Sequence, residues 1–120
     1  MDSRYEVIFY QKPDGSIPIY DFIMGLPHGL REKAARDLEL LQSYGRNLRM
    51  PYSKHIDDGV FELRIRLAND IARVFYFFYV GKKIIVTNGY VKKTQKLARR
   101  ELKRALKYKK DWEERSSHER

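Results

Sequence analysis

Cations are the residues of this chain whose types and spacing could do chemistry. The segment GYVKKTQKLARREL, residues 89–102, begins like the end of a strand and finishes like the start of a helix. Five cations gather where the two meet: Lys92, Lys93, Lys96, Arg99 and Arg100. Such a cluster can be a solvated helix face, a nucleic-acid-binding surface, or a site at which cations act on phosphate.

A second set of cations lies on the strands predicted before this segment. Arg73 is the basic residue of the otherwise apolar stretch IARVFYFFY, and burying its guanidinium without an anion would be costly. It therefore needs either Glu62 or a ligand phosphate, which a guanidinium binds in a bidentate manner and with a permanent charge. Lys54 and Arg64 come from neighbouring strands of the same predicted sheet, and Lys92 or Lys93 comes from the end of the last strand.

Clustered cations of this kind suit the cleavage of RNA. They lower one another's pKa, so one lysine can be partly neutral near pH 7 and act as a general base. That base would deprotonate a ribose 2′-hydroxyl, which attacks the adjacent phosphate, while charged neighbours stabilise the pentavalent phosphorane. An acid must protonate the leaving 5′ oxygen, and the sequence does not identify it. Tyr90 could stack on a base of single-stranded RNA.

Each candidate also has an ordinary structural explanation. The basic helix can be a solvated face, and Arg73 can be one half of an ion pair with Glu62. His55 can be a surface histidine, Lys54 a charge at a strand end, and Tyr90 a core residue. Their joint placement on one small predicted sheet is what favours a site.

Composition favours an anionic partner. The 120 residues carry a formal net charge of +9, which points first to nucleic acid, then to an acidic membrane surface or an acidic protein. The excess is concentrated, since twelve Lys or Arg residues and one acid, Glu101, lie between positions 82 and 110. The chain has no cysteine, and its three histidines lack the spacing of metal ligands, so we expect no metal and no cofactor.

No leader or membrane span is predicted. The longest apolar stretch, VFYFFYV at residues 74–80, is too short to cross a bilayer, and the apolar run near the start is short and follows charged residues. We therefore expect a cytoplasmic protein with no membrane contact and no small-molecule ligand.

Periodicity predicts an α+β domain. A strand over residues 5–10 ends at the turn KPDG, and apolar spacing predicts a helical hairpin up to Gly45. An antiparallel meander of three or four strands follows over about residues 52–91, and a basic helix over about 94–114 closes the domain. We expect one domain, residues 1–115, with helices on one sheet face, an open opposite face, and a frayed tail at 116–120.

Three motifs in order resemble one family. The segments PYSKHIDDGVFELR, IARVFYF and GYVKKTQK resemble the RelE/ParE toxin superfamily, most closely its HigB-like, phage-derived branch. That branch has P-Y-x-K-H-L before W-E-L-R, an arginine on the next strand, and F-x-K-K-T-x-K-T-P before the final helix. Here Phe61 replaces the tryptophan, and Leu97 and Ala98 replace Thr-Pro, so the last helix is expected to start earlier or sit differently.

The resemblance implies the toxin of a type II toxin–antitoxin pair with a RelE-like fold. It would be a metal-independent, ribosome-dependent mRNA endonuclease that arrests translation. Lys54, Arg64, Arg73, Lys92 and Lys93 match the basic active surface, with Arg73 and Arg64 as phosphate clamps and Glu62 orienting one of them. The RNA-binding residues would be His55, Tyr90, Lys96, Arg99, Arg100, Lys103 and Arg104.

The implied partners are a ribosome carrying mRNA and a HigA-like, helix-turn-helix antitoxin. Three alternatives remain open at this point: a ParE-like gyrase inhibitor without catalysis, a plain nucleic-acid-binding module, and an inactive RNA-binding relic that binds only its antitoxin. Neither the codon preference nor the choice of base among the lysines follows from the sequence.

Overall fold

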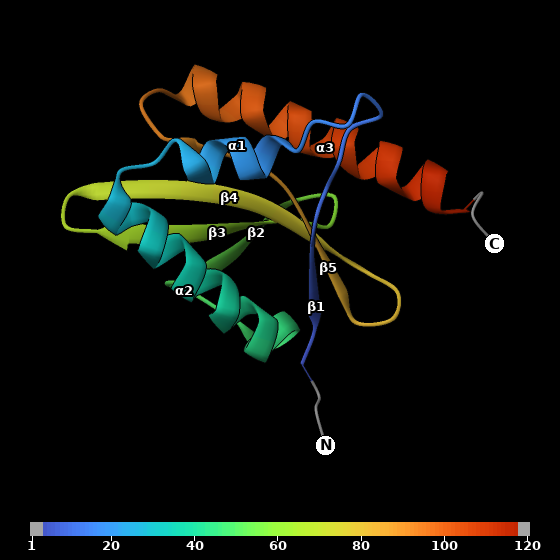
Figure 1. The fold of residues 1–120 in the computed structure, drawn as a ribbon, viewed down its shortest axis with the longest axis horizontal. Coiled ribbons are helices and arrows are strands. Elements are labelled where there is room, and N and C mark those ends of the chain that lie inside the picture. Colours follow the sequence, from blue (N-terminus) through green and yellow to red (C-terminus); the bar gives the residue numbers. More distant parts are fainter. Residues whose placement is uncertain (1–3, 118–120) are drawn as a thin grey trace.

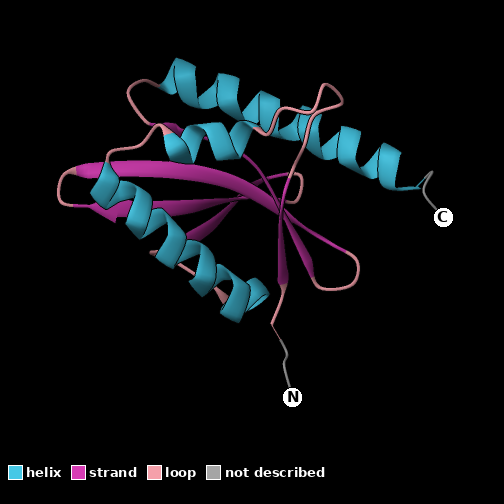
Figure 2. Ribbon diagram, in the orientation of Figure 1, coloured by secondary structure: helices cyan, strands magenta, loops and turns pink. Residues whose placement is uncertain are grey.

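The computed structural model describes residues 4–117 and has the predicted α+β architecture (Figures 1 and 2). The elements in chain order are β1 (Glu6–Phe9), α1 (Pro18–Met24), α2 (His28–Tyr44), the 3-10 turn η1 (Gly45–Asn47), β2 (Ser53–Asp57), β3 (Val60–Leu67), β4 (Asp70–Tyr79), β5 (Lys83–Val91) and α3 (Gln95–Ser117).

The sheet is five-stranded and mixed, with the order β1-β5-β4-β3-β2. Strands β2 to β5 form the predicted antiparallel meander, joined by tight turns in which Gly59 and Gly81 take a positive φ of 79°. The N-terminal strand β1 joins the edge of this meander parallel to β5, with Glu6 opposite Lys83. The hairpin α1–α2 separates these two parallel strands along the chain, as a crossover connection must.

Helices cover both faces of the sheet, so the expectation of one open face was wrong. Alternate residues of β3, such as Leu63 and Ile65, pack with Leu30 and Ala34 of α2. The opposite face carries Phe75, which belongs to a second cluster with Ala105 of α3. Strand β4 carries apolar side chains on both faces. Both sets are buried because helices lie on each side of the sheet.

A one-residue irregularity in β5 changes which face its side chains occupy. Val74 pairs with Gly89 and Tyr76 with Val86, so two steps along β4 match three steps along β5. This is the geometry of a β-bulge, which re-aims the residues after it. Val86 packs in the cluster of α1 and α2, whereas Tyr90 packs in the cluster of α3.

Helix α3 is longer than predicted. It begins at Gln95, where the hydroxyl of Thr94 accepts a hydrogen bond of 3.1 Å from the backbone N–H of Leu97, and it continues through Ser117. The helix thus includes two residues of the tail that we expected to be frayed, and the rest of that tail lies outside the described residues. Within residues 4–117, no helix combines the length and the apolar character that crossing a membrane requires.

Candidate active site

One cavity gathers most of the cations predicted to be catalytic. It has a volume of about 290 Å³ and lies between the sheet and the first two turns of α3. Its charged lining residues are Lys54 of β2, Glu62 and Arg64 of β3, Arg73 of β4, Lys92 after β5, and Arg99 of α3. Five cations therefore face one carboxylate, which makes the cavity suited to an anion.

Strand register explains this convergence. Glu62 lies opposite Lys54 on β2, and Arg64 lies directly opposite Arg73 on β4. Arg73 in turn lies opposite Tyr90 on β5. Residues directly opposite on antiparallel strands project from the same face, so all five side chains meet on the α3 side of the sheet.

Glu62 is the centre of the hydrogen-bond network. Its side chain is only 6% exposed, and its Oε1 accepts bonds from Arg73 Nη1 at 2.7 Å and from Arg64 Nε at 3.2 Å. The expected pairing of Glu62 with an arginine is thus present with both arginines. Two like charges on directly opposite residues repel each other, and the carboxylate between them offsets this repulsion.

Tyr90 contributes its hydroxyl rather than its ring face. The hydroxyl donates to Glu62 Oε2 over 3.4 Å, and the ring stacks on Phe75 with centroids 5.7 Å apart. Tyr90 is only 6% exposed, so little ring surface is available for stacking on an RNA base. Burial, and then the charge of Glu62, raise the pKa of Tyr90 to about 12, so the phenol stays protonated near pH 7.

The Arg73 guanidinium is held firmly but is not saturated. Its side chain is 13% exposed, and its Nε is buried without a hydrogen-bond partner among the described residues. The part of the guanidinium that stays exposed at the cavity wall can donate to a ligand acceptor. A phosphate oxygen is an acceptor of the right charge.

Polar contacts fix α3 as the wall of this cavity. Asn88, which lies in the β5 irregularity, donates from Nδ2 to the backbone oxygen of Glu101 at 3.1 Å and to its Oε1 at 3.2 Å. Glu101 is buried, although it lies in the most basic part of the chain. This anchor sets the rotation of α3 and presents Gln95, Ala98, Arg99 and Leu102 to the cavity.

Residues 21–110 match the model of a protein family described as phage-derived protein Gp49-like (DUF891). This match covers three quarters of the chain. The chain belongs to the Gp49-like family. That family is associated with toxins of toxin–antitoxin pairs and with endoribonuclease-type toxins. No curated protein is significantly similar to the chain.

The matched region of the Gp49-like chain holds all the cavity residues, but not every predicted site residue enters the cavity. Lys93, Lys96, Arg100 and Lys103 are exposed outside it, and Arg104 lines another cavity. His55 lies on the opposite face of the sheet, where its ring contacts Phe61 and its Nε2 accepts from the Gly59 N–H at 3.3 Å. His55 is therefore not among the residues that line the cavity of the catalytic candidates.

Two lining residues were assigned differently or missed at the sequence level. The sequence pattern places Arg99 on a docking face and does not single out Gln95, yet both line the cavity. The signal was present in their spacing, since residues 95, 98, 99 and 102 share one face of a helix. Among the described residues, no group of three or more His, Asp or Glu side chains is placed to hold a metal ion.

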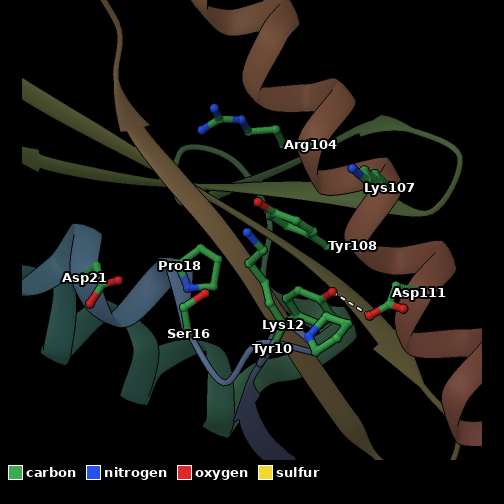
Figure 3. Close-up of a pocket in the computed structure, with 10 residues that line it drawn as sticks. Tyr10, Lys12, Ser16, Pro18, Asp21, Arg104, Lys107, Tyr108 and Asp111 are labelled. Carbon is green, nitrogen blue, oxygen red and sulfur yellow. Dashed lines mark hydrogen bonds between the residues drawn. The ribbon is translucent and has the colours of Figure 1, made fainter.

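A cavity of about 660 Å³ lies between α3 and the β1–α1 connection (Figure 3). Its charges are mixed, with Lys12, Arg104 and Lys107 facing Asp21 and Asp111. The Tyr10 hydroxyl donates to Asp111 Oδ2 at 2.6 Å, the bond drawn in Figure 3. This contact joins β1 to the second half of α3, so we interpret this region as a structural junction.

Proposed function

We propose that this protein is the toxin of a type II toxin–antitoxin pair, from the HigB-like branch of the RelE/ParE superfamily. It acts as a ribosome-dependent mRNA endonuclease that arrests translation. The observation that supports this proposal is the meeting of Lys54, Arg64, Arg73 and Lys92 in one cavity around the buried Glu62. Membership of a toxin-associated family supports it independently.

In the proposed reaction, a ribose 2′-hydroxyl attacks the adjacent phosphorus. Lys54 or Lys92, the two lysines of the cavity, removes the hydroxyl proton as the new O–P bond forms. The P–O5′ bond breaks, and the other lysine gives a proton to the leaving oxygen. The products are a 2′,3′-cyclic phosphate and a 5′-hydroxyl end, and an RNA that lacks the attacking 2′-hydroxyl is inert.

Arg73 and Arg64 bind the non-bridging oxygens of the scissile phosphate in this proposal. Their charge counters the charge that develops on the phosphorane, and donors that are already oriented are most effective in a site shielded from water. Glu62 acts through the arginines, since it holds both guanidinium groups in place. Tyr90 supports the same carboxylate and is therefore a positioning residue as well.

The exposed cations of α3 fit a docking role on the ribosome. Lys96, Arg100 and Lys103 lie outside the cavity on the same helix as Arg99, so they are free to contact ribosomal RNA while the cavity takes the messenger. Binding by such a surface weakens steeply with salt, because each neutralised phosphate releases counterions. The proposed partner in the cell is a HigA-like, helix-turn-helix antitoxin, and the proposed compartment is the cytoplasm.

Primer extension on one mRNA tests the proposal, with and without translating ribosomes and with Arg73→Ala in parallel. New 5′ ends that require ribosomes and disappear in the variant are the expected result. The variant should still bind ribosomes, because the exposed face of α3 is unchanged. If folded wild-type protein binds ribosomes and cuts nothing, the nuclease proposal fails. Damage to DNA rather than translation arrest would then favour a gyrase inhibitor.

A further inference from the structure

A second groove lies on the opposite side of the edge strand β2 and carries no acidic residue. It has a volume of about 550 Å³ and is lined by Arg46, Leu48, Arg49, Met50, Ser53, Lys54, His55 and Phe61. The chain has no acid between Glu39 and Asp57, so this whole segment is cationic. None of Arg46, Arg49 and Lys54 has a carboxylate partner within residues 4–117.

Lys54 connects this groove to the candidate active site. Its side chain lines both cavities, and β2 is the last strand of the sheet, so no further strand separates the two. A chain of phosphates can therefore pass from the Arg73 cavity around the edge of β2 and remain next to cations. The groove therefore adjoins the candidate active site, and both carry an excess of positive charge.

The groove also has surfaces suited to nucleobases. Met50 is 56% exposed and lines the groove together with His55 and Phe61, whose rings lie 5.1 Å apart. The Arg46 guanidinium lies 4.3 Å from the centroid of the Phe78 ring, which holds it in place without neutralising it. Alternating cations and exposed apolar or aromatic groups are characteristic of surfaces that bind single-stranded nucleic acid.

We propose that this groove binds single-stranded RNA. The bound segment lies next to the phosphate that occupies the candidate active site. Arg46 and Arg49 contact phosphates, and Met50 and His55 contact bases. In this proposal His55 keeps its expected RNA-binding role, although it does not line the cavity of the catalytic candidates. That the bound RNA is a substrate rests on the proposed function. The binding itself does not, because it requires no cleavage.

A direct binding measurement tests the groove. The probe is a 2′-O-methylated, single-stranded RNA of about ten nucleotides, which cannot be cut by 2′-hydroxyl attack. Fluorescence anisotropy over a range of salt gives the dissociation constant and its salt slope. For Arg46→Gln/Arg49→Gln we expect binding about tenfold weaker and a salt slope smaller by about 1.4, or about 0.7 per lost phosphate contact.

Two further variants serve as controls, one for the general loss of positive charge and one for the loss of the contact between Arg46 and Phe78. Arg36→Gln/Lys110→Gln removes the same charge from exposed positions outside both cavities, so it should leave the slope unchanged. Arg49→Gln alone leaves the contact between Arg46 and Phe78 intact, and it should lower the slope by about half as much. Circular dichroism establishes that each variant is folded.

Each outcome decides the proposal. If the double variant binds this RNA as tightly as the wild type, or if the wild type does not bind it, the groove is not an RNA site. The same holds if the groove variant loses an acidic protein partner but keeps RNA. If the wild type cuts no mRNA on ribosomes and the groove variant still loses RNA binding, the proposed nuclease fails and the groove proposal stands.

Discussion

Arg73 donates to Glu62 through a 2.7 Å hydrogen bond, while the Nε of the same guanidinium is buried without a partner in the described part of the chain. The Arg73 side chain is 13% exposed at the wall of the cavity, so part of the guanidinium remains open to a ligand. The pair therefore orients a cation and leaves part of its hydrogen-bonding capacity unused. That arrangement suits a site awaiting an anionic ligand.

Replacing Arg73 by lysine should abolish most cleavage although it keeps the charge. A lysine ammonium cannot bond Glu62 and present a planar pair of donors to phosphate at once. We expect cleavage of ribosome-bound mRNA to fall by about 100-fold or more, as the loss of one well-placed donor does elsewhere. Arg31→Lys is a matched control, since Arg31 also has a buried, unpaired Nε but lies on α2. Equal losses in both variants would contradict a special role for Arg73.

Glu62→Gln should lower both stability and cleavage. Removing one partner from a buried ion pair leaves uncompensated charge, and we expect unfolding to become easier by about 3 kcal/mol. Urea denaturation gives this value, and primer extension gives the activity. In the control Asp37→Asn, the partner Lys33 is 26% exposed and water can solvate it, so the stability loss should be smaller and cleavage unchanged. Full activity in Glu62→Gln would show that the arginines need no such orientation.

Gly89→Ala should destabilise the fold, because α1 packs directly on this residue. A Cβ here would lie 2.6 Å from the Phe22 ring and 2.9 Å from the backbone oxygen of Arg73. We expect a loss of about 1–3 kcal/mol from overpacking, measured by urea denaturation. Gly25→Ala is the control, since its Cβ would approach no atom closer than 3.4 Å and its φ is −84°. A Gly89→Ala protein as stable as the wild type would refute this close packing.

The contact between Tyr10 and Asp111 should make stability depend on pH in acid. The hydrogen bond from Tyr10, together with Arg115, lowers the pKa of Asp111 in the folded protein. A lowered pKa gives stabilisation that is complete above the unfolded value of about 3.9 and is lost as pH falls through the folded value. Asp111→Asn should therefore melt a few degrees lower than the wild type at pH 7 and should converge with it below about pH 4.

Thermal melts from neutral pH to acid measure this convergence. Glu114→Gln removes an exposed charge from the same end of α3 and should melt like the wild type at every pH. A difference between Asp111→Asn and the wild type that stays constant with pH would mean that ionisation of Asp111 does not carry the effect.

The sequence by itself determined the features that depend on neighbouring residues. Alternation in β3 predicted one polar face, and tight turns at residues 57–59 and 68–70 set the antiparallel register. Short turns fix which residues lie opposite one another, so the local sequence is enough to bring Arg64 and Arg73 together. The α+β class and the two N-terminal helices follow from periodicity in the same way.

Only the tertiary structure decided which surfaces meet across the sheet. The position of α3 on the second face, the parallel pairing of β1, and the irregularity that turns Tyr90 towards Glu62 depend on packing between distant segments. No local pattern specifies them, because an apolar strand such as β4 is equally consistent with several ways of being buried. The same long-range packing creates the groove that His55 shares with Arg46.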